Sequence, residues 1–329
     1  MAYHTEVKVD AAPTQDEQSQ AKKVFDDLVA KRKAVYMRLQ YAVINAIPHE
    51  YASTSVVFGE EEVMPTPFRF DLKIRYVTLK DKVGNEIYVA LAGTTGQGIA
   101  QAAAATAHLA AKCHNLKKVV LIGIAAGQPN LSDKEKDVRL GDVVIGDKLI
   151  QYDHVKRSDG KMELRGDNIA PGDRELLGVV DRLRSLQERK GPKVTQKPWD
   201  RYIELGCGEV RSAMRPDRSR DPHSNARKYT KGLTYERPDD RPFLHVGTVG
   251  SANTLLKDAT FRDDLNARYG TMAYEMEGAG VAIAAATTGL SYLNVRGVCD
   301  YGDNNKNDDW QTYASVCAAA VARAIIEET

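Results

Sequence analysis

The sequence predicts an α/β fold, in which helices cover a central sheet. Residues 278–288 are small and aliphatic with helical spacing, and residues 292–298 follow as a strand-like run. Gly289 separates them, as is common where a helix ends. A helix made almost entirely of Ala, Gly, Val and Ile must pack closely on both sides, which a layered α/β fold allows. A second passage from strand to helix, from residues 87–92 to residues 99–113, indicates the same class.

Length, charge and cysteine usage limit the classes of protein to which this chain can belong. The 329 residues suit one elaborated domain, and a net charge of +1 gives no overall attraction to nucleic acid or to an anionic membrane. There is no apolar run of about eighteen residues and the N-terminus is polar, so we expect neither a membrane span nor a secretory signal. The 4 cysteines lack the paired spacing of a metal site. They suggest a reducing, cytoplasmic setting and no metal site. We also expect no cofactor.

Residues 1–40 are predicted to be an N-terminal extension of a domain formed by residues 41–329. Residues 1–15 look loosely attached, and residues 18–39 have the spacing of an amphipathic helix. The apolar side of this helix carries Val24, Phe25, Leu28, Val29 and Val35. We expect the helix to cap the domain, and contact with a partner protein is the alternative.

The first strand of the domain is predicted over residues 41–47. Pro48 cannot donate to a strand ladder, so the strand should end there and Glu50 should emerge at an edge of the sheet. A position in a solvated loop fits this acid equally well.

Glycines follow the strands predicted over residues 87–92 and 119–122. Residues 93–98 lead into a helix, where free N–H groups can bind an anion or Gly96 can let a ligand approach the backbone. As a dinucleotide-binding fingerprint this stretch is poor, because glutamine holds the third glycine position and no acid follows the next strand. The small residues at 123–127 also let a ligand lie against the main chain.

The middle of the chain is predicted to hold a strand over residues 141–150, a helix over residues 174–186 and an insertion over about residues 188–241. The insertion is rich in Arg, Lys, Pro and Asp and has no long apolar run. It is either a solvated excursion or a lid whose arginines hold substrate phosphates, since guanidinium groups bind phosphate oxygens in pairs. The arginines concerned are Arg211, Arg215, Arg218, Arg220 and Arg227.

Acids flank the helix and the strand described first. Glu275 and Glu277 precede the helix, and Asp300 directly follows the strand. An acid beyond a buried strand lies at the edge where open α/β sheets bind ligands. Helix or turn capping would also explain each acid by itself.

Two further elements complete the predicted domain. Residues 243–249 form a strand leading to Ser251 and Asn253, whose polar groups suit contacts with a base or a sugar. The last helix, from residue 309 or 310 to residue 327, has apolar residues at helical spacing and is predicted to lie in the core.

Together, the runs EMEGAG and VRGVCDYGD resemble the signature of the nucleoside phosphorylase and nucleosidase superfamily, which includes purine nucleoside phosphorylases and methylthioadenosine nucleosidases. The runs HVGTVGSANTLLKDATFRDDL and CDYGDNNKNDDWQTYASVCAAAVA are similar to members found beside, or fused to, innate-immune and anti-phage signalling modules. The resemblance covers the chain from about Tyr41 onward. It implies a single phosphorylase-like domain, with a central mixed sheet flanked by helices, and an assembly of identical subunits.

The resemblance also implies roles for individual residues. Asp300 would protonate the leaving purine, Glu277 would hold the ribose hydroxyls and stabilise the cationic sugar, and Glu50 would position water. The other residues implied in substrate binding are Met276, Glu275, Gly96, Ala125, Ala126, Gly127, Ser251, Asn253 and Arg296.

One departure from the family pattern bears on the reaction. Phosphorolytic members have an arginine and a serine that hold phosphate, and this chain has Leu121 and Ile124 there. Two apolar residues cannot neutralise a phosphate dianion, which favours water as the nucleophile. The predicted function is hydrolysis of the N-glycosidic bond of a purine nucleoside or nucleotide. ATP or another adenine nucleotide is a candidate substrate. A candidate role is that of a defence effector that works with a signalling or defence partner protein. A phosphorolytic purine nucleoside phosphorylase and a non-catalytic nucleotide sensor remain as alternatives.

Overall fold

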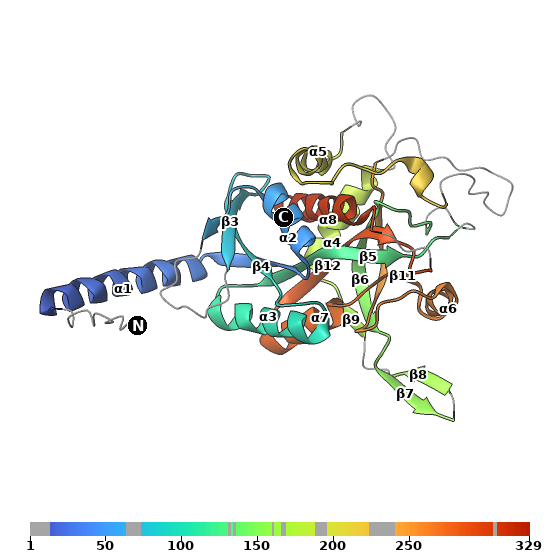
Figure 1. The fold of residues 1–329 in the computed structure, drawn as a ribbon, viewed down its shortest axis with the longest axis horizontal. Coiled ribbons are helices and arrows are strands. Elements are labelled where there is room, and N and C mark those ends of the chain that lie inside the picture. Colours follow the sequence, from blue (N-terminus) through green and yellow to red (C-terminus); the bar gives the residue numbers. More distant parts are fainter. Residues whose placement is uncertain are drawn as a thin grey trace, which may run out of the picture.

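The computed structural model describes residues 14–63, 74–130, 133, 136–159, 161–165, 169–187, 196–223, 241–304 and 308–329. A mixed sheet runs through the domain and helices cover both of its faces, as Figure 1 shows. This confirms the predicted α/β class.

Among the described residues, ten strands form the main sheet, in the order β11, β10, β6, β12, β5, β1, β4, β3 and β2, with β9 paired to β6. Their bounds are β1 (Leu39–Asn45), β2 (Glu62–Val63), β3 (Arg75–Lys80), β4 (Glu86–Gly93), β5 (Lys118–Gly127), β6 (Val143–Gln151), β9 (Ile169–Pro171), β10 (Leu244–Ser251), β11 (Thr271–Glu275) and β12 (Ser291–Asp300). A separate hairpin consists of β7 (Val155–Ser158) and β8 (Lys161–Leu164). The strand β12 is parallel to β5 and antiparallel to β6, so the sheet is mixed, as predicted.

Part of the sheet closes on itself. The strand β11 pairs in parallel with β10 and, through Ala273 and Tyr274, also pairs antiparallel with the end of β5 at Gly127 and Ala126. The strands β11, β10, β6, β12 and β5 therefore form a closed ring. This closure brings the end of β5 next to the residues that follow β11.

Helices pack on the two faces of the sheet. One face is covered by α2 (Pro48–Phe58), α4 (Arg174–Ser185), α5 (Asp200–Glu209) and α8 (Gln311–Glu327), and the other by α3 (Ile99–Lys112) and α7 (Gly278–Thr288). The helix α6 (Ala259–Tyr269) lies beside β11. Two large apolar clusters, one on each face, form the core.

Small residues allow the closest approaches of backbone to backbone. A Cβ atom added to Gly280 would collide with the carbonyl oxygen of Ile99, and one added to Gly297 would collide with that of Ala314. The helix α7 therefore lies directly against the start of α3, and β12 lies directly against α8. Because α7 also contacts the strands β12, β5 and β6, it packs against α3 and against the sheet, as predicted, while Ile283 on its outer side is 56% exposed.

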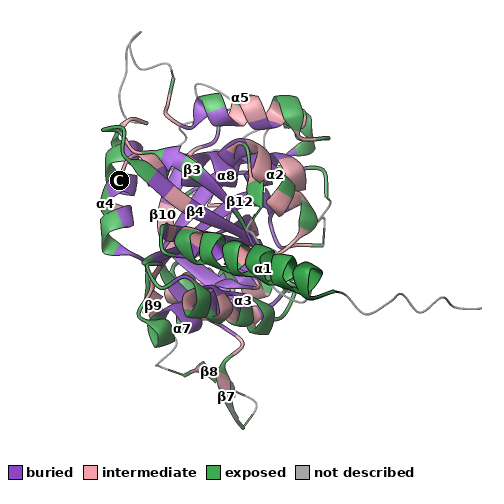
Figure 2. Cartoon of the chain, turned by 90° about the vertical axis from the view of Figure 1, so that its left-hand side faces the viewer, coloured by how far each residue is buried: buried purple, intermediate pink, exposed green. Residues whose placement is uncertain are grey.

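The N-terminal helix covers less of the domain than expected. The helix α1 (Gln15–Tyr36) begins after Thr14, whose side chain and that of Glu17 form a capping box. Of its residues, only Arg32 and Tyr36 are buried, and Figure 2 shows that most of the helix is exposed. The expected cap is therefore limited to the last turns of the helix.

Part of the predicted insertion belongs to the core. The helix α5 packs on α2 and α8, and Trp199, just before it, is fully buried. Residues 188–195 and 224–240 lie outside the described residues. In the described parts of the chain, no helix has both the length and the apolar character needed to cross a membrane.

Candidate active site

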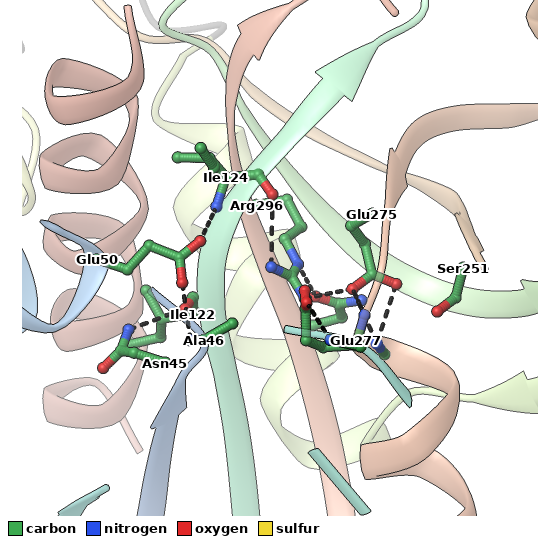
Figure 3. Close-up of polar contacts among 12 residues, drawn as sticks. Asn45, Ala46, Glu50, Ile122, Ile124, Ser251, Glu275, Glu277 and Arg296 are labelled. Atoms are coloured by element: carbon green, nitrogen blue, oxygen red, sulfur yellow. Dashed lines mark hydrogen bonds and ion pairs between the residues drawn. The ribbon is translucent and has the colours of Figure 1, made fainter. Parts of the chain in front are cut away.

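A cavity of about 600 Å³ opens where β1, β5, β11 and β12 end. Several of the predicted site residues line it: Glu50, Ala125, Ala126, Glu275, Met276, Glu277 and Asp300. Chain segments far apart in the sequence thus bring the four predicted acids to one cavity. Figure 3 shows Glu50 on one side of β5 and Glu275 and Glu277 on the other, with Arg296 between them.

Glu50 lies in the first turn of α2. It lies neither at a strand edge nor in a solvated loop, the two positions that the sequence suggested. Its carboxylate accepts hydrogen bonds from the backbone N–H groups of Ala46 at 2.8 Å, Ile47 at 3.1 Å and Ile124 at 2.8 Å. The strand β1 ends at Asn45, two residues before the predicted end, and Pro48 starts a helix, because a proline in the first helical turn needs no N–H partner. The side chain is 3% exposed, so Glu50 is held rigidly beside β5.

Glu275 is fixed by the start of α7 and by Arg296. Its carboxylate accepts hydrogen bonds from the backbone N–H groups of Glu277 at 2.9 Å and Gly278 at 2.8 Å, and it forms a buried ion pair with Arg296. These bonds hold the Glu275 carboxylate in place at the cavity wall.

Arg296 is fully buried and does not line the cavity. Besides pairing with Glu275, its guanidinium group lies 3.5 Å from the carboxylate of Glu277 and donates to Asn294 at 2.7 Å. The expectation of direct contact with substrate is therefore corrected. Arg296 can affect the cavity only through Glu275 and Glu277, the two lining acids whose carboxylates it contacts.

Glu277 combines burial with access to the cavity. Its carboxylate accepts a hydrogen bond from the backbone N–H of Gly98 at 3.0 Å. Burial raises the pKa of Glu277 to about 7; Arg296 opposes this shift, and the nearby carboxylates of Glu275 and Glu50 add to it. Such a group changes charge near neutral pH, as is frequent at functional sites.

Asp300 ends β12 at the cavity wall and is 4% exposed. Its carboxylate accepts a hydrogen bond from the backbone N–H of Gly302 at 2.8 Å and contacts the thiol of Cys299 at 3.2 Å. The side chain is therefore held in place at the end of a buried strand, as the sequence predicted.

Four other predicted residues are near the cavity without lining it. Ser251 accepts a hydrogen bond from the N–H of Ala279, and Asn253 accepts one from the N–H of Ile99, so these side chains meet the first residues of α7 and α3. Gly127 takes part in the ring closure. Gly96 lies next to Gln97, which does line the cavity. None of these four residues is part of the cavity wall, and their direct contact with a substrate stays a prediction.

Sequence reasoning missed several lining residues. Tyr152 and Tyr274 meet edge to face with ring centroids 6.4 Å apart, and Leu255 and Leu256 add apolar surface beside them. The strand ending near Tyr152 was a usable signal. Six other polar lining residues were also missed, namely His49, Gln97, Thr254, Lys257, Asp308 and Gln311.

The arginines of the predicted insertion do not line the cavity where the structure describes them. Arg220 pairs with Asp309 at 2.7 Å, and the guanidinium group of Arg215 lies 5.2 Å from the ring centroid of Trp310. Neither Arg211 nor Arg218 is part of the cavity wall, and Arg227 lies outside the described residues. Arg215 and Arg220 thus gather just before the N-terminus of α8.

Comparison with known proteins gives a consistent result. Residues 40–327 match the family model described as the phosphorylase superfamily. The chain is 27% identical over 234 residues to a nucleotide-binding leucine-rich repeat (NLR)-like protein of Hyaloscypha variabilis, covering 64% of this chain and 22% of that protein. It is 23% identical over 290 residues to the ATP nucleosidase Cap17 of Escherichia coli, covering 85% of this chain and 49% of that protein. The chain thus spans half or less of the length of these two relatives.

A solved structure of similar fold is the 5'-methylthioadenosine/S-adenosylhomocysteine nucleosidase of Helicobacter pylori. It superposes with a TM-score of 0.59 at 14% identity, covering 88% of this chain and 99% of the other. At this identity the likeness concerns the fold alone.

Proposed function

The chain belongs to the phosphorylase superfamily, and on this basis we propose that it hydrolyses the N-glycosidic bond of an adenine nucleoside or nucleotide. The observation that carries the proposal is the gathering of Glu50, Glu277 and Asp300 at one cavity. Three carboxyl groups from different connections can serve the sugar, the leaving base and the nucleophile at the same time.

Glu277 serves the sugar in this proposal. As the glycosidic bond stretches, the ribose gains positive charge, and a fixed carboxylate beside it stabilises that charge. The backbone N–H of Gly98 and the guanidinium group of Arg296 keep the Glu277 carboxylate in position. Met276, between the two glutamates, supplies an apolar surface under the ribose.

Asp300 serves the leaving base. A purine leaves more easily when a ring nitrogen receives a proton or a strong hydrogen bond as the bond breaks. Asp300 lies at the end of the cavity that holds the aromatic rings of Tyr152 and Tyr274, which offer flat apolar surface to a base.

Glu50 serves the nucleophile, which is water. Its carboxylate takes the backbone N–H groups of Ala46, Ile47 and Ile124, donors that an anion would otherwise use. A phosphate dianion here would lie beside a buried carboxylate and the apolar side chain of Ile124, and this charge pairing is unfavourable; Leu121 is buried in the core and does not line the cavity. Water meets no such barrier, and Glu50 can orient it and take its proton.

The relatives support an adenine nucleotide as the substrate. Cap17 of Escherichia coli is named an ATP nucleosidase, and the fungal relative is an NLR-like protein. We extend this to a substrate carrying 5′ phosphates and to a role as a defence effector that works with a signalling partner. An assembly of identical subunits in the cytoplasm remains part of the same proposal.

One experiment tests the reaction class. Purified protein is incubated with adenosine, inosine, AMP and ATP, each with and without inorganic phosphate, and the products are separated by chromatography. We expect free adenine without added phosphate. Formation of ribose 1-phosphate that depends on phosphate would identify a phosphorylase instead, and no free base from any substrate would favour a binding module.

A further inference from the structure

Tyr301, the residue directly after Asp300, is anchored in the core. It is 3% exposed, belongs to the apolar cluster on the α2 and α8 side of the sheet, and does not line the cavity. Its backbone carbonyl accepts a hydrogen bond from the guanidinium group of Arg262 on α6. Two neighbours in sequence therefore have different surroundings, because Asp300 forms part of the cavity wall and Tyr301 is surrounded by protein.

The hydroxyl group of Tyr301 is held by two other parts of the chain. It donates to the carboxylate of Asp221 at 3.0 Å and accepts a hydrogen bond from the backbone N–H of Leu140 at 3.3 Å. The ring of His223 meets the Tyr301 ring edge to face, with centroids 4.8 Å apart. Asp221 is 7% exposed, so its bond with the hydroxyl group is buried and charge-assisted, and bonds of this kind are strong.

Asp221 lies in the stretch that the sequence described either as a solvated excursion or as a lid. It directly follows the short 3₁₀ helix η1 (Arg218–Arg220). The carboxylate oxygen that accepts from Tyr301 also accepts from the backbone N–H of His223 at 2.9 Å, so the acid is itself held in place. An acid 80 residues earlier in the sequence thus anchors the residue beside Asp300.

The next peptide group joins this anchor to the Asp300 carboxylate. The carbonyl of Tyr301 and the N–H of Gly302 belong to one planar peptide group. Arg262 holds its carbonyl oxygen, and its N–H donates to Oδ1 of Asp300 at 2.8 Å. Gly302 has a φ of 59°, and a Cβ atom added there would lie 3.2 Å from that of Ala126, so the turn has little room to shift.

We propose that Asp221 and Tyr301 are positioning residues for Asp300. Their buried hydrogen bond fixes the peptide group that follows Tyr301, and this group orients the Asp300 carboxyl toward the leaving base. The inference rests on the function proposed above, in which Asp300 serves the base. An acid must lie within hydrogen-bond distance of the ring nitrogen, and a misplacement of about 1 Å can slow a reaction roughly 100-fold.

The first test removes either end of this hydrogen bond and measures base release from whichever of adenosine, AMP and ATP the wild type cleaves fastest. Tyr301→Phe and Asp221→Leu should each lower kcat roughly tenfold to 100-fold and leave KM nearly unchanged, because neither residue lines the cavity. Asp221→Asn keeps an oxygen that can accept from the hydroxyl group, so its kcat should stay within roughly threefold of wild type. The double variant Tyr301→Phe/Asp221→Leu should be no slower than the slower single variant.

A second comparison separates positioning from a general loss of structure. In the Asp300→Asn background, Tyr301→Phe should change the residual kcat by less than roughly twofold, because no acid remains to be oriented. A merely structural role would lower kcat by the same factor in both backgrounds. Equal factors, or wild-type kcat in Tyr301→Phe alone, would overturn the proposal.

Tyr202→Phe is the matched control. Tyr202 on α5 is also buried, and its hydroxyl group also donates to a carboxylate, that of Glu327. Neither Tyr202 nor Glu327 lines the cavity. The same chemical change should therefore leave kcat at the wild-type value, whatever its effect on Tm. A loss of kcat equal to that of Tyr301→Phe would show that the effect is not specific to the bond with Asp221, and the proposal would fail.

A wild-type protein that releases no base would contradict the proposed function and still leave the positioning testable. The readout is then the ¹³C chemical shift of the Asp300 carboxyl carbon in protein labelled at aspartate, assigned by its absence in Asp300→Asn. This shift should change in Tyr301→Phe and stay at the wild-type value in Tyr202→Phe. An unchanged shift in Tyr301→Phe would refute the positioning of Asp300.

Discussion

The carboxylate of Glu50 accepts a hydrogen bond from the backbone N–H of Ile124 across 2.8 Å, which joins the first turn of α2 to β5 at the cavity wall. The same carboxylate also takes two N–H groups of the β1–α2 connection. An acid therefore occupies the donors that a phosphate nucleophile would need.

Removing the Glu50 carboxylate should slow hydrolysis, and a small carboxylate added to the solution should restore part of the rate. Glu50→Ala should reduce kcat roughly 10²–10⁴-fold, the usual contribution of a general base. Added formate, a small carboxylate, should restore part of the activity by occupying the vacated donors. Rates of base release are measured with and without formate. Full activity in Glu50→Ala, or no response to formate together with an intact fold, would remove Glu50 from the nucleophile's path.

Asp300→Asn should leave a folded protein that barely turns over. Asn keeps an oxygen for the N–H of Gly302 but cannot donate the proton, so kcat should drop roughly 10²–10⁴-fold while Tm changes little. Asp264→Asn, an exposed acid on α6, is the control and should keep wild-type activity. Normal base release by the Asp300 variant would refute its role as the acid.

Activity should depend on the ionisation of Glu277. Burial raises the pKa of this carboxyl group to about 7, and the ionised form is the one that stabilises a cationic ribose. Therefore kcat/KM, which reports the free protein, should fall as the pH drops through about 7. Glu277→Gln should be slow and should lose this limb of the profile. A wild-type profile that is flat between pH 6 and 8 would contradict the assignment.

The raised pKa of Glu277 also affects stability, and in the opposite direction: activity should fall as the pH drops, whereas stability should fall as the pH rises. Because the folded-state pKa lies above the ordinary value of 4.5, the folded state holds the proton more tightly than the unfolded state. The stabilisation from this group is complete below about pH 4.5 and is lost as the pH rises through about 7. Tm of Glu277→Gln relative to wild type should accordingly rise over this window.

Two glycines offer a matched test of the close packing of helices. Gly280→Ala should destabilise the fold by about 1–3 kcal/mol, because the added methyl group meets the backbone of α3. Gly178→Ala, in α4, meets no atom within 4 Å, and it should stabilise by up to about 1 kcal/mol through helix propensity. Urea unfolding of both variants gives the comparison. Equal effects would show that the contact of α7 with α3 is not tight.

The sequence predicted the order of the regular elements well where periodicity was strong. The strands expected over residues 87–92, 243–249 and 292–298 correspond to β4, β10 and β12, and the small-residue helix corresponds to α7. It missed α2, because Pro48 was taken only as the end of a strand, although proline also suits the first turn of a helix. A proline is compatible both with the end of a strand and with the start of a helix, and only tertiary packing decides between the two.

The site was predicted in part for a similar reason. Strand ends and flanking acids identify residues that arrive at a sheet edge, which was enough to find Glu277 and Asp300. They do not tell a side chain that faces the cavity from one that supports its neighbour. Arg296 is the example, because it lies on the right strand and is turned inward, where buried carboxylates hold it.

Because Tyr274 must pair with Ala126, the cavity can form only late in the folding of the chain. The two partners belong to opposite halves of the sequence, and contacts between distant segments form slowly because a long loop must close first. A nascent chain on the ribosome would therefore hold β1 and β5 well before Glu277 and Asp300 had emerged. Such a chain would lack Glu277 and Asp300 at the cavity, so the proposed activity would begin only once the ring of strands had closed.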